Sequence, residues 1–238
     1  MFSKGTSRLE LPFIMVPVVA VLVAWGFVAV GNAPAELTMG SAHRILYVHV
    51  SVAWVGLVAF SLMAVCGLGY LLTSKMKWDH WGQASAEIGW ICSTLTLLTG
   101  SLWAHFAWGT WWTWDPRLLT SFVLWALFSG YFILRAGVDE PHRRATLGAV
   151  LAVIGFADVP LVTMATRWYR GIHPVSPEMD PMMQHALLAC ALGVSAMMAL
   201  LLIYRCRQLD LEKQILDLKM DVTDQGGKCH GISRSSLS

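Results

Sequence analysis

Six long stretches that are almost free of charge dominate this 238-residue sequence. They cover residues 11–31, 45–73, 88–106, 118–134, 145–166 and 182–204, and Asp158 is the one carboxylate among them. A helix that crosses a bilayer needs about 17 to 25 mostly apolar residues, and each stretch is long enough. The charged fraction is 13%, against roughly 25% in soluble domains. We therefore expect an all-α integral membrane protein with six transmembrane helices, and we exclude a water-soluble core.

The basic residues predict the orientation of these helices. With both termini in the cytoplasm, the outer segments hold only Arg44, Arg117, Arg167 and Arg170, whereas the inner segments hold Lys4, Arg8, Lys75, Lys77, Arg135, Arg143, Arg144, Arg205, Arg207 and Lys213. Lysine and arginine are enriched in cytoplasmic segments of membrane proteins. Both termini are therefore predicted to be cytoplasmic, with a six-helix membrane domain over residues 1–205 and a cytoplasmic tail over residues 206–238.

The tail carries apolar residues at helical spacing. Leu211, Ile215, Leu218 and Val222 recur every three or four positions, with charged residues between them. This pattern is typical of an amphipathic helix. We expect the last membrane helix to continue into the cytoplasm, where its apolar face is either solvated or bound to a partner.

The segment "WGTWWTWDPR", residues 108–117, lies between the third and fourth expected helices on the outer side, where we expect an interfacial helix or a loop. Tryptophan gathers at membrane interfaces, so an aromatic belt is one explanation. A belt is normally spread over several helix ends, however, whereas the indoles here belong to one connection, residues 103–117. As an interfacial helix, Trp108, Trp111 and Trp112 would share a face with Asp115. Because such a surface is broad, flat and apolar, the run equally predicts a platform for a large planar ligand.

Two histidines lie near this segment in the expected topology. His49, in "RILYVHVSVAWVG", falls about one turn inside the outer end of the second helix, and His173 falls in the third outer segment, in "RWYRGIHPVSPEMD". Neutral imidazole binds borderline metals and haem iron readily. A single such histidine is more often structural, but two beside an aromatic platform favour a ligand-binding role.

Other chemistries lack their motifs. The sequence contains no CxxC pair, P-loop, GxGxxG or HExxH, so thiol–disulfide, nucleotide and zinc-hydrolase chemistry are not expected of this chain.

A charged Asp158 inside a membrane helix is unfavourable in free energy. It is expected to face the bundle interior or to be protonated, and Pro160 is expected to open a helix turn near it.

The segment "WGTWWTWDPR" resembles the tryptophan-rich WWD signature of haem-handling proteins of cytochrome c maturation. Six helices, one such signature and a histidine on each flanking outer segment are similar to the CcmC family in particular. The resemblance runs from "RILYVHV" through "LTGSLWAHFAWGTWWTWD" to "RWYRGIHPV", and larger WWD relatives carry more helices than this chain can hold.

The resemblance implies a multi-pass protein of the bacterial inner membrane that binds haem b as transient cargo at its periplasmic face. His49 and His173 match the two family histidines that ligate haem iron. Trp108, Gly109, Trp112, Trp114 and Asp115 match the WWD residues, and Trp111 belongs to the same run. His105 and His185 match no ligand of the family and are expected to pack at the interface.

The resemblance also implies a route for the haem. The protein would help transfer it to the membrane-anchored haem chaperone CcmE, beside a small membrane subunit CcmD and an ABC-type ATPase complex CcmAB. It would act as a binding and transfer protein rather than an enzyme, without a nucleic-acid partner. His173, followed by Pro174 and Pro177, is expected to be the exchangeable ligand.

Haem carries two propionates, and the outer arginines Arg117, Arg167 and Arg170 suit carboxylates. Lipid headgroups are their alternative partners.

The main rival is a b-type cytochrome subunit that carries electrons to or from quinone. Such proteins usually ligate haem between helices, yet the fourth and fifth expected helices contain no histidine. A haem transporter would need an intramembrane polar path, for which only Asp158 is available. A structural scaffold leaves the indole cluster unexplained.

Overall fold

The computed structural model describes residues 3–37, 39–168, 173 and 179–235. Its helices are α1 (Ser3–Asn32), the short 3-10 helix η1 (Ser41–His43), α2 (Arg44–Thr73), α3 (Met76–Trp108), α4 (Pro116–Ala136), α5 (Pro141–Gly155), α6 (Asp158–Trp168) and α7 (Pro181–Ser235). Within these ranges the regular structure is helical, apart from one isolated bridge between Glu36 and Gly40. The expectation of an all-α protein is confirmed.

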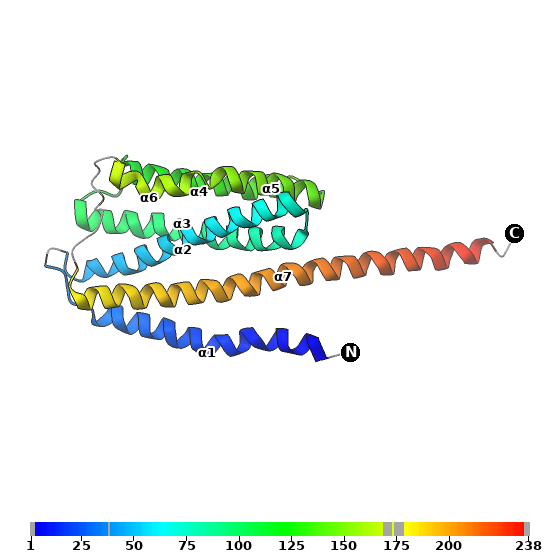
Figure 1. Ribbon diagram of the computed structural model, residues 1–238, viewed down its shortest axis with the longest axis horizontal. Coiled ribbons are helices and arrows are strands. Elements are labelled where there is room, and N and C mark those ends of the chain that lie inside the picture. Colours follow the sequence, from blue (N-terminus) through cyan, green and yellow to red (C-terminus); the bar gives the residue numbers. More distant parts are fainter. Residues whose placement is uncertain (1–2, 38, 169–172, 174–178, 236–238) are drawn as a thin grey trace.

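The helices run roughly parallel or antiparallel in one elongated bundle (Figure 1). α2 packs along α3, α5 lies against both α2 and α4, and α6 packs on α4. α1 pairs with α7, which joins the rest through α2 and α3. We call the end where α3 stops and α4 starts the tryptophan end. The opposite end, where α1 begins and from which α7 projects, is the tail end.

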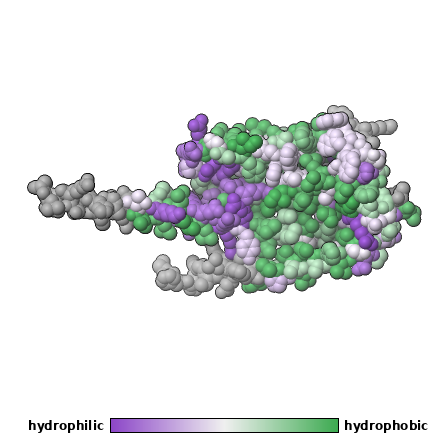
Figure 2. Space-filling model, turned by 180° about the vertical axis from the view of Figure 1, so that it is seen from behind, coloured by the Kyte–Doolittle hydropathy of each residue, from purple (hydrophilic) through white to green (hydrophobic). Residues whose placement is uncertain are grey.

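Five helical stretches among the described residues are long and apolar enough to cross a membrane: Ile14–Asn32, Ser41–Thr73, Pro116–Ala136, Pro141–Ala165 and Pro181–Thr223. The sixth expected stretch, 88–106, lies in α3, whose threonines, serines and indoles lower its mean hydropathy. The count of six spans therefore stays a prediction, although α3 packs beside α2 within the bundle. Figure 2 shows the apolar surface over the bundle and a polar zone where the tail leaves it.

The stretch 145–166, expected as one helix, is divided between α5 and α6. Residues 156–157 form a turn. Pro160 explains the break, because its ring would clash with the carbonyl of Phe156 in a continuous helix and it has no N–H to donate. Asp158 begins α6 and is buried, with 8% of its surface exposed, so its expected interior position is confirmed.

α7 is continuous over 55 residues, which gives it a length of about 80 Å. The expected extension of the last membrane helix into the tail is confirmed (Figure 1). Leu211, Ile215, Leu218 and Val222 are all more than half exposed on this projecting part.

The tail end is held by ion pairs between helices. Arg135 of α4 donates to both carboxylate oxygens of Asp79 in α3, at 2.6 and 2.9 Å, and also to Gln83. Arg205 of α7 makes the same two-point contact with Glu87 of α3, at 2.6 and 2.9 Å. Two-point contacts of this kind fix orientation as well as distance, so α4 and α7 are both tied to α3.

The interior between α2, α4 and α6 is packed with apolar side chains. Phe60 of α2 stacks on Phe128 of α4, with ring centroids 3.9 Å apart and an interplanar angle of 8°. Leu124 and Val162 belong to the same buried cluster. Toward the tryptophan end this packing gives way to a cavity.

Candidate functional site

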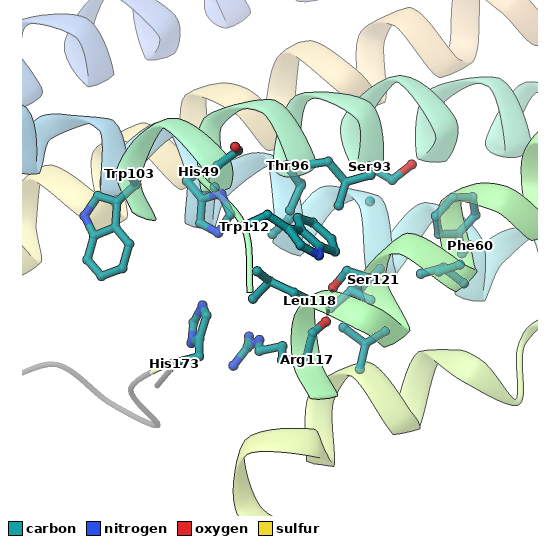
Figure 3. A pocket seen from close by; sticks show the side chains of 18 of the residues that line it. His49, Phe60, Ser93, Thr96, Trp103, Trp112, Arg117, Leu118, Ser121 and His173 are labelled. Carbon is teal, nitrogen blue, oxygen red and sulfur yellow. Dashed lines mark hydrogen bonds between the residues drawn. The ribbon is translucent and has the colours of Figure 1, made fainter. Parts of the chain in front are cut away.

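A cavity opens between α2, α3, α4 and α6 toward the tryptophan end, with about 850 Å³ of empty space when the part open to solvent is included. Small residues on three helices leave this space empty; they are Ala53, Gly56, Ser93, Gly100, Ser101 and Ser121. Its lining includes the apolar Leu57, Phe60, Leu124 and Val162 as well as histidines, indoles and one arginine. Figure 3 shows Phe60 on the far side of the cavity from Trp103 and His173.

His49 reaches the cavity from the second turn of α2. Its Nδ1 lies 3.1 Å from the hydroxyl oxygen of Thr99 in α3. The ring also lies directly against Gly100, where an added Cβ would come within 2.7 Å of the imidazole Cε1. Because α2 and α3 pack along each other, the ring is held between two rigid helices.

His173 lines the same cavity from the connection between α6 and α7. Its imidazole meets the indole of Trp108 at the end of α3, with ring centroids 6.2 Å apart and an angle of 68°. Figure 3 shows His49 and His173 on opposite sides of the cavity mouth. The two predicted ligands, far apart in sequence, are thus placed around one space.

Three tryptophans line the cavity: Trp103, Trp108 and Trp112. Trp103 and Trp108 meet edge to face at 5.0 Å, and Trp112 packs in the same manner on Phe122 of α4 at 6.3 Å. These edge-to-face contacts fix the indole planes. The cavity wall is therefore aromatic and rigid.

The tryptophan run itself is a loop between α3 and α4, so the alternative of an interfacial helix with a shared indole face is wrong. Gly109 ends α3 with a φ of 70°, a left-handed conformation that favours glycine. The hydroxyl of Ser101 then donates to the carbonyl of Trp111 at 2.6 Å and holds the loop against α3. A helical face cannot form because the chain turns at Gly109.

Trp111 and Trp114 are exposed and are not among the described residues that line the cavity. Trp111 stacks on His105, with centroids 4.1 Å apart and an angle of 7°, and Trp114 meets Trp112 edge to face at 5.9 Å. The indoles therefore divide into an inner set that borders the cavity and an outer set at the surface.

Arg117 borders the cavity from the first turn of α4. The carboxylate of Asp115 accepts a hydrogen bond from the Arg117 backbone N–H at 2.9 Å and caps this helix, with Pro116 in its first turn. A cation at a helix N-terminus is opposed by the helix dipole, so Arg117 does not stabilise α4 by its charge. Arg117 instead lies at the cavity, with the Asp115 carboxylate near it.

The other predicted residues lie elsewhere. Gly109 and Asp115 shape the loop and the start of α4 and are not among the described cavity-lining residues. Arg167 is exposed in the last turn of α6, and Arg170 falls outside the described residues. His105 stacks on Trp111 and His185 meets Trp25 at 5.5 Å, so both pack against indoles.

Several residues of the site are not apparent from the sequence pattern. Trp103 belongs to the tryptophan segment, but only the geometry shows that it faces the cavity. Thr99 and Gly100 sit in an ordinary apolar helix, and their role follows from how α3 packs on α2. Their one sequence signal is the small-residue pattern "TGS", which permits a side chain of a neighbouring helix to approach α3 closely.

The fold and this cavity define a class: helical membrane proteins with a histidine- and indole-lined site at one end of the bundle. The family model described as heme exporter protein C, CcmC, matches residues 2–221 of this chain. The chain therefore belongs to the CcmC family.

Curated relatives agree with this assignment. "Heme exporter protein C" of Bradyrhizobium diazoefficiens is 30% identical over 226 residues, which cover 92% of this chain and 85% of the relative. The protein of the same name from Escherichia coli (strain K12) is 32% identical over 209 residues, 84% of each chain. A putative cytochrome c biosynthesis ccmC-like mitochondrial protein of Marchantia polymorpha is 29% identical over 150 residues, 63% of each.

Proposed function

We propose that this protein binds haem b in the cavity, with His49 and His173 as axial ligands, and passes it to the haem chaperone CcmE during cytochrome c maturation. The observation that supports this most strongly is the placement of two imidazoles, from α2 and from the α6–α7 connection, around one indole-lined cavity. The names of the relatives refer to haem export and cytochrome c biosynthesis. Haem is the cargo in this proposal, not a resident cofactor.

The lining suits each part of a haem molecule. Imidazole nitrogens are common axial ligands of haem iron. The faces of Trp103, Trp108 and Trp112 suit the porphyrin plane, and the apolar inner wall with Leu57 suits its hydrocarbon edge. Arg117 supplies a positive charge and up to five N–H donors for a propionate. Arg167 and Arg170 are proposed as further contacts for the propionates.

Transfer requires that one iron ligand leave. His49 is held between α2 and α3, whereas His173 comes from the connection between two helices, so we propose His173 as the exchangeable ligand. The exposed indoles Trp111 and Trp114 lie in the loop beside the cavity, and we propose that they contact the acceptor. The surface around these two indoles would orient CcmE toward the haem edge.

The small subunit CcmD and the ATPase complex CcmAB are proposed partners, with ATP hydrolysis assigned to CcmAB.

The site is proposed to face the periplasm of a bacterial inner membrane, with both termini in the cytoplasm. Leu37 is fully exposed beyond the end of α1, near the tryptophan end. A Leu37→Cys variant in a Cys229→Ser background is expected to react with a membrane-impermeant maleimide added to intact spheroplasts. Lys213→Cys in the tail should react only after lysis. The opposite pattern would reverse the topology.

The electron-carrier alternative has weaker support, because one proposed ligand comes from a connection rather than from a helix within the bundle. A reconstituted transfer assay separates the two functions. Haem-loaded protein is incubated with purified CcmE, CcmD, CcmAB and ATP, and covalent haem on CcmE is detected by peroxidase staining after denaturing electrophoresis. We expect labelled CcmE from the parent and none from His173→Ala. Equal labelling without this protein would contradict the proposal.

A further inference from the structure

The hydroxyl of Thr99 is committed as a donor to its own helix. Its oxygen lies 2.6 Å from the carbonyl oxygen of Leu95 and 3.4 Å from that of Thr96. Carbonyl oxygens only accept hydrogen bonds, and a hydroxyl has one proton to donate. The Thr99 proton therefore points back along α3, and its oxygen lone pairs face His49.

This arrangement decides which nitrogen of His49 carries the proton. Nδ1 lies 3.1 Å from the Thr99 oxygen, so that contact is a hydrogen bond only if Nδ1 donates. In a neutral imidazole with a proton on Nδ1, the lone pair available to a metal is on Nε2.

Gly100 limits where the ring can move. A Cβ at this position would lie 2.7 Å from Cε1 and 3.2 Å from Nδ1 of His49. The imidazole thus occupies the space that any larger residue would fill, and it lies against the backbone of α3. Figure 3 shows the same ring at the cavity mouth, across from His173.

We infer that Thr99 and Gly100 are positioning residues for the iron ligand: Gly100 seats the His49 ring, and Thr99 holds the proton on Nδ1 so that Nε2 faces the cavity. The inference rests on the proposed haem-binding function. A ligating histidine whose second nitrogen donates a hydrogen bond is fixed in tautomer and orientation and is a more basic ligand. Loss of such a partner lowers metal affinity about 10- to 100-fold.

Nitrogen-15 NMR of histidine-labelled protein without haem tests the tautomer directly, because protonated and unprotonated ring nitrogens have well-separated shifts. The His49 signals are identified by their loss in His49→Ala. We expect a protonated Nδ1 and an unprotonated Nε2 in the parent. Thr99→Val, which removes the acceptor but keeps the shape, should increase the Nε2-protonated form, and Thr99→Ser should restore the parent pattern.

Haem titration then gives the functional consequence. Thr99→Val is expected to bind haem about 10- to 100-fold more weakly, with Thr99→Ser close to the parent. Thr146→Val is the matched control, because Thr146 makes the same hydroxyl-to-carbonyl contact at an exposed position of α5. Thr146→Val should change neither the His49 tautomer nor the haem affinity.

These measurements distinguish the positioning role of Thr99 and Gly100 from the proposed haem binding through His49. A protonated Nε2 in the parent, or a Thr99→Val variant unchanged in both tautomer and affinity, would overturn the positioning role while leaving haem binding intact. A parent protein that shows the expected tautomer yet binds no haem would overturn the ligand role of His49, and the proposed function with it.

Discussion

The indole of Trp108 meets the imidazole of His173 edge to face, at a centroid distance of 6.2 Å. This contact joins the end of α3 to the connection between α6 and α7, two parts of the chain that are more than sixty residues apart. Because Trp108 in turn packs on Trp103 at 5.0 Å, the position of His173 is coupled to the indole wall. The tryptophan run therefore shapes the cavity and also contacts one proposed ligand.

Gly100→Ala is predicted to abolish tight haem binding, because its Cβ would lie 2.7 Å from the His49 ring and force it away from α3. Six-coordinate haem should be lost to a similar extent as in His49→Ala, as judged by the optical spectrum. Gly130→Ala in α4 is the control, because nothing lies within 4 Å of a Cβ at that position. Normal haem ligation in Gly100→Ala would contradict the packing argument.

The inner and outer indoles are predicted to have different roles. Trp108→Ala and Trp112→Ala remove cavity wall and should weaken haem binding in a titration. Trp111→Ala and Trp114→Ala change the exposed surface, so they should leave haem binding within about twofold of the parent and reduce covalent transfer to CcmE. Equal loss of haem binding in all four variants would argue for one continuous indole platform.

Arg117→Ala is predicted to weaken haem binding about tenfold to a hundredfold, since a hydrogen bond to a charged group contributes about 1.5–3 kcal/mol. The same variant should bind haem dimethyl ester as well as the parent does, because esterification removes the propionate charges. Titration of both proteins with both ligands gives the comparison. If Arg117→Ala weakens the two ligands equally, the arginine supports the cavity rather than a propionate.

Asp115→Ala is predicted to destabilise the start of α4 by about 0.5–2 kcal/mol, the usual effect of removing a side-chain N-cap. Asp115→Asn retains an acceptor for the Arg117 N–H and should remain close to the parent. Thermal unfolding in detergent measures the difference. If both variants were equally destabilised, the carboxylate charge would matter more than the cap.

Much of the fold follows from the sequence because the membrane restricts the choices. Stretches of apolar residues must be helical when no water can satisfy their backbone, and α1, α2, α4 and the continuous α7 lie where the pattern predicts them. Pro160 predicted an opened helix turn near the position where α5 ends and α6 begins. The weak hydropathy of α3 has a structural cause, since its polar face borders the cavity with Ser93 and Thr96.

The site was less predictable at the level of single residues. Histidine and tryptophan stand out by chemistry, so His49, His173, Trp108 and Trp112 could be selected from the sequence. Helical periodicity could not place Trp111, because Gly109 turns the chain before it. Thr99 and Gly100 depend on the packing of α3 against α2, and nothing in a single sequence specifies that contact.

The axial ligand pair is the central claim, and optical spectroscopy of the haem-loaded protein tests it most directly. The parent is compared with His49→Ala and His173→Ala, and His105→Ala serves as the control because that ring stacks on Trp111 rather than facing the cavity. We predict a six-coordinate, low-spin spectrum for the parent and for His105→Ala, and its loss or conversion to a five-coordinate form in the other two variants. An unchanged spectrum in either His49→Ala or His173→Ala would contradict the assignment of that histidine as a ligand.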